Sequence, residues 1–396
     1  MDNSRAFSGD TLFTFMAIAT GVAVSCIYLN QPLLQTLGRD LNTTTGNIGL
    51  IASFTQIGYA LGLFFLIPLG DIVSKKKLII IKQIFLIISL VLAAVSTHWI
   101  AILFASMFIG LLATVAQDFV AFSADLAEVK SRGKVLGLVM SGLFMGILCS
   151  RTLSGLIAGF GGWRSVFIIF AILSTIFTLV IVRKVPSVEA SGKSSYGTLL
   201  KSLIHHFSTK KKLRSSLFTQ GLLGFAFSAF WTNLSFYLGG PAFNLSPTHI
   251  GLFGIAGAAG VLVAPYAGKM ADNQSPYKGI ILGAILVFVS FGAMLAIQTS
   301  LVVLALGAVV FDLGMQIALV SHQTIIFSLE AKARSSINAI FMTGMFTFFA
   351  VGSFISVKLQ QNFGWHAVLI SGLVTSTLAF ILAMRAAKAS KHGLMI

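Results

Sequence analysis

Long apolar runs separated by short polar gaps occur along the whole of this 396-residue chain. A helix needs about 20 consecutive apolar residues to cross the hydrocarbon core of a bilayer, and runs of this length recur throughout. Charged residues make up only 10% of the chain, whereas soluble proteins carry about 25%. The sequence therefore excludes a soluble multidomain enzyme and predicts an all-α polytopic membrane protein.

The apolar runs predict twelve transmembrane helices. Six lie in the first half of the chain, at 11–36, 46–69, 78–96, 99–126, 135–160 and 164–182. The other six lie at 215–239, 249–270, 278–297, 300–327, 336–360 and 364–385. An even number of spans places both termini on one side of the membrane.

Basic residues determine which side that is. When the termini are assigned to the cytoplasm, 22 of the 27 Lys and Arg residues fall in cytoplasmic segments and only Arg39 and Arg164 fall in outer loops. Lys82, Arg151 and Lys358 lie within spans. Short cytoplasmic loops carry an excess of basic residues in membrane proteins, so the N- and C-termini are predicted to be cytoplasmic.

An internal repeat divides the chain into two six-helix halves. Residues 128–168 align without a gap to residues 330–370, with eleven identities in 41 pairs. Glu-x-Lys-x-Arg and Gly-Trp recur in one register, which shared apolar composition does not explain. We expect an N-terminal half at 1–182, a cytoplasmic linker at 183–214 and a C-terminal half at 215–396. Such repeats place the substrate site between the halves, near the bilayer midplane.

Within the linker, residues 196–207 have the apolar spacing of a helix, and either a helix on the membrane surface or a plain loop fits them. His205 and His206 are adjacent and would point in different directions from a helix. We therefore interpret them as a solvated pair and predict no metal site. A membrane-bound enzyme is not expected either, because the chain has no P-loop, no His-Glu-x-x-His and no Gly-x-Ser-x-Gly.

The loop after the second predicted span carries a recognisable motif, Ile67-Pro-Leu-Gly-Asp71-Ile-Val-Ser-Lys75-Lys76. It resembles the loop signature of the major facilitator superfamily, Gly-x-x-x-Asp-Arg-x-Gly-Arg-Arg, with departures at Ile67, Ile72 and Ser74. A degenerate second copy follows span 8 at 268–272. The resemblance, with the span count and the repeat, covers the whole chain and implies a transporter with two six-helix halves.

Within that superfamily the chain resembles the twelve-span drug:proton antiporters. Span 5 carries Gly142, Gly146, Gly155 and Gly159, similar to the glycine-rich antiporter signature but without its Gly-Pro pair; close helix packing also explains this spacing. The usual Arg in the middle of span 4 is missing. The family places an acid where Asp125 lies, so Asp71, Lys75, Lys76 and Asp125 are predicted to form a cytoplasmic latch; helix capping is the alternative.

Charges inside the membrane indicate the coupling site. Arg151 and Asp312 both lie about 25–27 Å along their helices from the cytoplasmic ends, in opposite halves of the chain. A buried charge at this depth usually faces a cavity and a partner. Arg151 and Asp312 are therefore predicted to form a pair that couples protons to transport. Asp118, about 15 Å from the inner end, is a second proton-carrying candidate.

Polar and aromatic residues at similar depth are predicted to bind substrate. They are Asn30, Gln31, Gln56, Trp231, Asn233 and Tyr237. Such a lining suits an amphipathic organic solute better than an inorganic ion, although a single amide can also bond to a neighbouring helix.

These features predict a proton antiporter that exports a small amphipathic organic solute by alternating access, without cofactor or metal. A proton-coupled uptake symporter for a small organic anion is the alternative, because Arg151 suits an anion. A passive facilitator or a non-transporting sensor with the same fold is also compatible. Short loops suit a bacterial inner membrane, and the resemblance to the superfamily implies a monomer. Lipid, solute and protons are the expected partners, with no nucleic acid.

Overall fold

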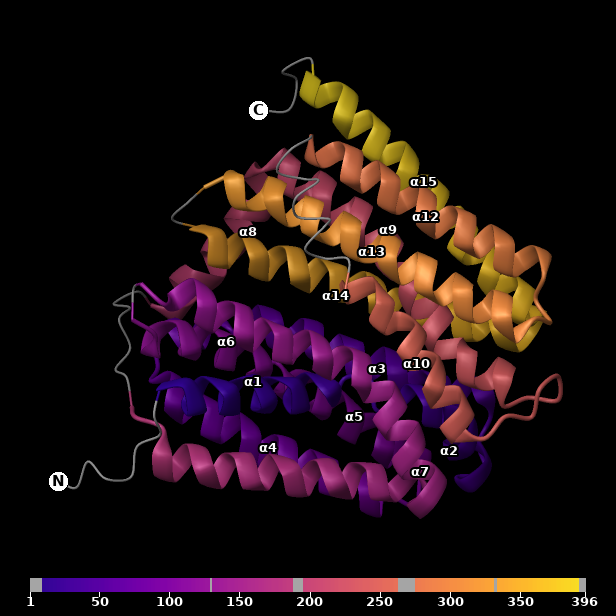
Figure 1. Cartoon of the computed structure of the whole chain (residues 1–396), viewed down its shortest axis with the longest axis horizontal. Coiled ribbons are helices and arrows are strands. Elements are labelled where there is room, and N and C mark those ends of the chain that lie inside the picture. Colours follow the sequence, from indigo (N-terminus) through magenta and orange to yellow (C-terminus); the bar gives the residue numbers. More distant parts are fainter. Residues whose placement is uncertain (1–8, 129, 188–194, 263–274, 331–332, 392–396) are drawn as a thin grey trace.

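The computed structural model describes residues 9–128, 130–187, 195–262, 275–330 and 333–391. These residues form helices and no strand. Arg5, Lys332 and the predicted loop copy at 268–272 lie outside the described residues. Figure 1 shows long helices running roughly side by side, with α1 to α7 on one side of the molecule and α9 to α15 on the other.

The helices of the N-terminal half follow the predicted spans closely. They are α1 (Gly9–Ser25), η2 (Gln31–Leu33), α2 (Leu34–Asp40), α3 (Thr45–Phe65), η3 (Pro68–Asp71), α4 (Lys75–Val95), α5 (Trp99–Ala113), α6 (Val115–Leu126) and α7 (Arg132–Lys184). Span 1 is interrupted after Ser25 by a turn that leads into η2, and span 4 is interrupted at Thr114. Continuous apolar runs do not reveal such interruptions.

The linker and the C-terminal half contain the remaining helices. They are α8 (Tyr196–Thr209), α9 (Lys211–Leu238), α10 (Pro247–Leu262), α12 (Pro276–Ala296), α13 (Leu301–Ser328), α14 (Arg334–Phe363) and α15 (Trp365–Lys391). Residues 196–207, for which a helix and a loop were both open, are helical. His205 and His206 therefore lie on a helix.

One glycine divides the long helix α7 into spans 5 and 6. Gly162 has φ +75° and ψ 170° within the otherwise helical α7, in a region that is essentially restricted to glycine. Gly364, its counterpart in the sequence repeat, has φ +78° and ψ −174° between α14 and α15. The same backbone conformation thus turns the chain at equivalent points of the two halves.

Hydropathy and burial fit a bilayer-spanning bundle. Eight helices of the described residues are long and apolar enough to cross a membrane, and α7 supplies two spans because of its turn. Large apolar side chains such as Ile84, Phe85, Ile88 and Ile176 are 46–54% exposed on the outside of α4 and α7, as expected for a lipid-facing surface. In contrast, α9 buries Gln220, Thr232 and Asn233 completely, and it packs against α3, α13, α14 and α15.

The halves meet through two pairs of helices. α3 packs against α14, and α7 packs against α10. Near the outer ends, the backbones of Gly155 in α7 and Gly251 in α10 are in close contact, and Thr152 Oγ1 donates to the carbonyl of Gly251 at 3.0 Å. Arg39 Nη2 also donates to the carbonyl of Gly239 at 3.0 Å. These contacts close the outer side between the halves.

Candidate functional site

A cavity of about 150 Å³ lies between the halves, on the cytoplasmic side of these contacts. Its two charged side chains are Arg151 and Asp312. Toward the cytoplasmic ends of the helices it is lined by four amides, and methionines and aromatic rings form most of the rest. The amides are Gln117, Gln316, Gln323 and Asn338; the methionines are Met140, Met315, Met342 and Met345. This lining matches an organic solute with a large apolar part.

Arg151 reaches the cavity from α7 and is only 3% exposed. Its Nε donates to Oε1 of Gln31 at 2.6 Å. Its guanidinium carbon lies 4.1 Å from the ring centre of Trp231, 4.7 Å from that of Tyr28 and 5.5 Å from that of Phe227. Aromatic rings at these distances stabilise a desolvated cation. Among the described residues, Nη2 of Arg151 has no hydrogen-bond partner.

Asp312 enters the same cavity from α13 and is 6% exposed. The structure gives no direct ion pair between Asp312 and Arg151 among the described residues. Instead, Nε1 of Trp231 donates to Oδ1 of Asp312 at 3.4 Å. The indole therefore contacts the cation with its face and the carboxylate with its N–H, and it connects the two charges.

Asp118 in α6 pairs with Lys82 in α4. Nζ of Lys82 lies 2.5 Å from Oδ2 of Asp118, and the two side chains are only 2% and 4% exposed. Sequence analysis placed Lys82 within a span but did not identify it as the partner of Asp118. The pair joins spans 3 and 4 of the N-terminal half. Removing one partner of a buried ion pair lowers the stability of the fold by about 3–5 kcal/mol.

The predicted latch residues lie together at the cytoplasmic end of the N-terminal half. Nζ of Lys75 lies 2.5 Å from Oδ2 of Asp125. Nζ of Lys76 donates to the carbonyls of Val182 and Val185 at 3.1 and 2.6 Å. Asp71 is exposed at the end of η3 and forms no ion pair with a described residue. The contacts tie α4 to α6 and to the end of α7.

None of the six side chains predicted to bind substrate lines the cavity. Gln31 and Trp231 contact Arg151. Asn30 donates to Thr55 Oγ1 at 2.8 Å and Asn233 to Ser356 Oγ at 2.8 Å, while Gln56 accepts from Ser228 at 3.0 Å. Tyr237 stacks on Trp365, with ring centres 4.7 Å apart.

The amides and methionines that do line the cavity were missed by sequence analysis. Gln117 directly precedes Asp118, and Gln323 lies five residues before the end of α13. Both lie closer to the cytoplasmic ends of their helices than Arg151 and Asp312 do. Asn338 lies in the second turn of α14, a position that a search for midplane residues also passes over.

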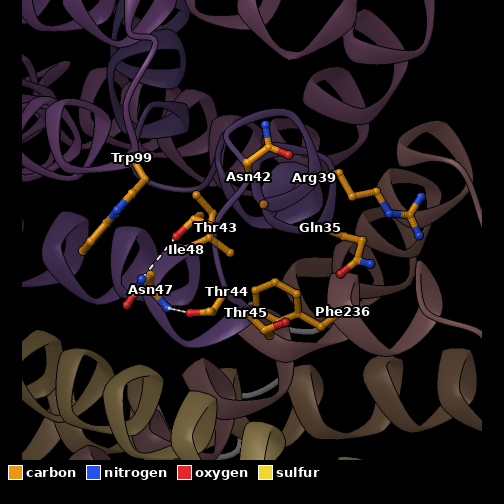
Figure 2. A pocket seen from close by; sticks show the side chains of 11 residues that line it. Gln35, Arg39, Asn42, Thr43, Thr44, Thr45, Asn47, Ile48, Trp99 and Phe236 are labelled. Atoms are coloured by element: carbon orange, nitrogen blue, oxygen red, sulfur yellow. Dashed lines mark hydrogen bonds between the residues drawn. The ribbon is translucent and has the colours of Figure 1, made fainter.

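A larger concave surface of about 790 Å³ lies at the outer end of the N-terminal half. Figure 2 shows polar side chains around it, with Trp99 and Arg39 on opposite sides. Asn47 donates through Nδ2 to Thr43 Oγ1 and through its backbone N–H to Thr44 Oγ1, both at 3.2 Å. This larger surface lies outside the contacts that close the outer side between the halves. We therefore regard the smaller cavity at Arg151 and Asp312 as the candidate site.

The linker helix α8 bridges the cytoplasmic ends of the two halves. Tyr196 donates to the carbonyl of Phe65 in α3 at 2.8 Å, and burial raises the pKa of its hydroxyl. Just after α8, Nζ of Lys210 lies 2.7 Å from Oε2 of Glu330; this hydrogen bond lowers the pKa of the Glu330 carboxyl. Burial lowers the pKa of His206. Among the described residues, no group of three or more His, Cys, Asp or Glu side chains is placed to hold a metal ion.

Comparison with known proteins identifies the family. The family model of the Major Facilitator Superfamily matches residues 16–273 and 217–394. The chain belongs to the major facilitator superfamily. Within it, the chain is 38% identical over 362 residues to the uncharacterized transporter YgaY of Escherichia coli O157:H7, covering 91% of this chain and 92% of that one. It is 26% identical over 374 residues to the probable transporter SCO4007 of Streptomyces coelicolor, covering 89% and 82%.

Solved structures of the superfamily share the fold. A bacterial homologue of the human lysosomal transporter Spinster, in an inward-facing and unoccupied conformation, superimposes with a TM-score of 0.81. That match covers 98% of each chain at 12% identity. The nucleoside transporter NupG gives a TM-score of 0.76 at 15% identity, covering 94% of this chain and 98% of its own. The prediction of an all-α fold of the major facilitator type is thereby confirmed, as is transport by a protein of this superfamily.

Proposed function

We propose that this transporter exports a small amphipathic organic solute in exchange for protons, by alternating access to the cavity at Arg151 and Asp312. The observation that carries the proposal is that these two opposite charges, from opposite halves, line one cavity. Transporters built from two repeated halves place their sites at such an interface. We assign the moving halves to residues 1–182 and 215–396, with 183–214 as the linker.

The proposed coupling step is a proton transfer to Asp312. Ionised Asp312 is attracted to Arg151 across the Trp231 ring, which favours contact between α7 and α13 at this level. A proton that arrives from outside neutralises the carboxylate and removes the attraction. Solute and proton would then compete for one cavity, so that inward proton flow drives outward solute flow. Asp118, held by Lys82, is a second residue that we propose to carry protons.

The predicted latch residues are gathered at the cytoplasmic end of the N-terminal half. Lys75, Lys76 and Asp125 hold α4, α6 and the end of α7 together, and Asp71 lies beside them on η3. We propose that this cluster, with Asp71, closes the cytoplasmic side when the cavity faces outward. The remaining predicted residues, Asn30, Gln56, Asn233 and Tyr237, are proposed to support the walls behind Gln31 and Trp231.

We assign the protein to a bacterial inner membrane as a monomer, acting on a solute and protons without a cofactor. The relatives described above are bacterial transporters, which supports a multi-pass protein of the cell membrane.

A second candidate function is uptake of a small organic anion together with protons. Nη2 of Arg151 is buried and has no hydrogen-bond partner in the described part of the chain, which favours uptake because a carboxylate on the solute would satisfy that donor. An anion on Arg151 would also repel ionised Asp312 and favour its protonation, so solute and proton would bind together.

The first experiment compares metabolites in the medium and in cells that express the wild type, Asp312→Asn or no transporter. A compound enriched outside only with the wild type identifies the exported solute. If the compound accumulates inside instead, export is wrong and the uptake symporter replaces it.

The second experiment measures proton movement in everted vesicles that have been acidified inside. Adding the identified solute should raise the internal pH with the wild type and with Lys358→Gln, a control whose charge lies near the Phe354 ring and not in the cavity. Asp312→Asn should give no response. A wild-type response that persists in Asp312→Asn would show that Asp312 does not couple protons.

A further inference from the structure

A groove between the halves lies on the lateral surface of the molecule, apart from the central cavity. It lies between α3 and α14, has a volume of about 550 Å³, and is lined by side chains of residues 57–65 and 343–355. Four apolar side chains at this groove are 41–43% exposed: Phe65, Val351, Phe354 and Ile355. Exposed apolar side chains on a membrane-spanning helix face lipid, so the groove opens to the bilayer.

On α3 the groove lies in the half of the helix nearer the cytoplasm, and on α14 it runs along the middle of the helix. α3 ends on the cytoplasmic side at Phe65, and α14 begins there at Arg334. The α14 wall, from Thr343 to Ile355, extends about 18 Å, and the α3 wall, from Ile57 to Phe65, about 12 Å. One leaflet contributes about half of a hydrocarbon core of ~30 Å. The two walls are therefore similar in length to one leaflet of the hydrocarbon core, which is the length of one acyl chain.

Its lining contains little that would bind a polar molecule. Nine of the eleven lining side chains are apolar. Thr347, one of the two hydroxyl residues, donates its Oγ1 to the carbonyl of Thr343 in the same helix at 2.9 Å. An apolar occupant thus displaces no hydrogen bond to Thr347.

Two exposed basic residues lie on the helices that adjoin the cytoplasmic end of this groove. α8 packs against α14 and η3, and Tyr196 anchors its first turn to the carbonyl of Phe65. Lys201 on α8 and Arg334 at the start of α14 are exposed. These positive charges lie on elements next to the level at which the headgroup of a lipid in the groove would sit, and they attract anionic headgroups.

We propose that the groove between α3 and α14 binds one acyl chain of an anionic phospholipid from the cytoplasmic leaflet, with its headgroup near α8. The walls of the groove belong to opposite halves. A second part of this proposal rests on the proposed alternating access, in which the two halves move relative to each other. Separation of α3 and α14 would change the groove, so the bound lipid would favour the conformation described above.

The test uses phosphatidylglycerol with a photoactivatable diazirine on one acyl chain, mixed with the purified full-length transporter in phosphatidylcholine vesicles. Mass spectrometry of the digested protein locates the cross-links. Cross-links are expected within residues 57–65 and 343–355. Unlabelled phosphatidylglycerol should suppress them more strongly than added phosphatidylcholine.

Two matched threonine variants separate this groove from ordinary lipid contact. Thr347→Phe fills the groove from an exposed position, and cross-linking there should fall about tenfold, equivalent to ~1.4 kcal/mol. Thr377 is likewise exposed, donates to a carbonyl of its own helix, and lines an apolar groove of about 340 Å³ between α12 and α15. That groove lies within one half, so Thr377→Phe should leave cross-linking at α3 and α14 unchanged.

Three results would overturn the proposal: no cross-links in this groove, equal cross-linking in Thr347→Phe, or equal competition by the two lipids. The assay contains no solute and no proton gradient. Its failure would therefore leave the proposed export intact, and failure of the vesicle assay for proton movement would not affect lipid binding.

Discussion

The guanidinium carbon of Arg151 lies 4.1 Å from the centre of the Trp231 ring. The same indole donates its Nε1–H to Asp312, so one aromatic side chain contacts both charges of the candidate site. Trp231 comes from α9, whereas Arg151 and Asp312 come from α7 and α13. The ring thus connects one helix of the N-terminal half to two of the C-terminal half.

Two substitutions of Trp231 should separate its contacts. Trp231→Phe keeps an aromatic face over Arg151 but removes the N–H donor to Asp312. We expect proton-coupled exchange in vesicles to fall, while thermal unfolding of the purified protein stays near the wild type. Trp231→Leu removes both contacts and should also destabilise the protein, by about 2 kcal/mol for a desolvated cation–π contact. Equal exchange rates in Trp231→Phe and the wild type would show that the N–H does not contribute to coupling.

The two lysine–aspartate pairs of the N-terminal half provide a matched comparison of burial. Both have a closest N–O distance of 2.5 Å, but Lys82–Asp118 is 2% and 4% exposed and Lys75–Asp125 is 21% and 38% exposed. Lys82→Met leaves a buried carboxylate without its partner, and the free energy of unfolding should fall by about 3–5 kcal/mol. Lys75→Met should change it by only about 0–1 kcal/mol.

Thermal or denaturant unfolding of the purified protein measures both effects. The double variant Lys82→Met/Asp118→Leu should recover much of the lost stability, because no unpaired charge remains. If Lys82→Met and Lys75→Met destabilise equally, burial does not determine the contribution of the pair.

The Lys82–Asp118 pair also shows what the sequence could reveal. Arg151 and Asp312 lie at equal depth along their helices, which predicted that they share a site, and both line one cavity. Lys82 lies seven residues after the start of α4 and Asp118 eight residues before the end of α6, about 11 and 12 Å from the cytoplasmic ends. The same argument would have paired them.

Other features could not be predicted from one sequence. The apolar runs predict helical spans, and the all-α fold confirms the helices. The orientation and the repeat are predictions from charge and from the aligned motifs. The lining of the cavity depends on how helices rotate about their own axes, and apolar runs without a polar face leave that rotation undetermined. For this reason Gln31 and Asn233 were placed in the site, while Gln117 and Asn338, which line it, were not identified.

The turn at Gly162 should not tolerate a side chain. Its φ of +75° and ψ of 170° are in a region that costs about 1–3 kcal/mol for other residues. Gly162→Ala should therefore lower the thermal unfolding temperature. Gly137, an exposed helical glycine whose added Cβ would meet nothing within 4 Å, is the control, and Gly137→Ala should be neutral or stabilising. The idea fails if both alanines have the same effect.

Asp40, at the outer end of α2, should make stability depend on pH. It accepts hydrogen bonds from Arg164 Nη1 at 2.7 Å and from Trp163 Nε1 at 2.8 Å. The bond from Arg164 is the main reason why the pKa of the Asp40 carboxyl in the folded protein is lower than its usual value. A lowered pKa stabilises the fold above the usual value, about 3.9, and this contribution disappears as the pH falls through the lowered pKa.

Asp40→Asn should therefore unfold at a lower temperature than the wild type at pH 7, and the difference should shrink below about pH 4. The effect will be small, because both partners are 41–45% exposed and solvent screens the pair,. Asp10→Asn, at an exposed acid in the first turn of α1, is the control for removing one surface carboxylate. A difference for Asp40→Asn that stays constant from pH 7 to pH 3 would assign the effect to packing and not to charge.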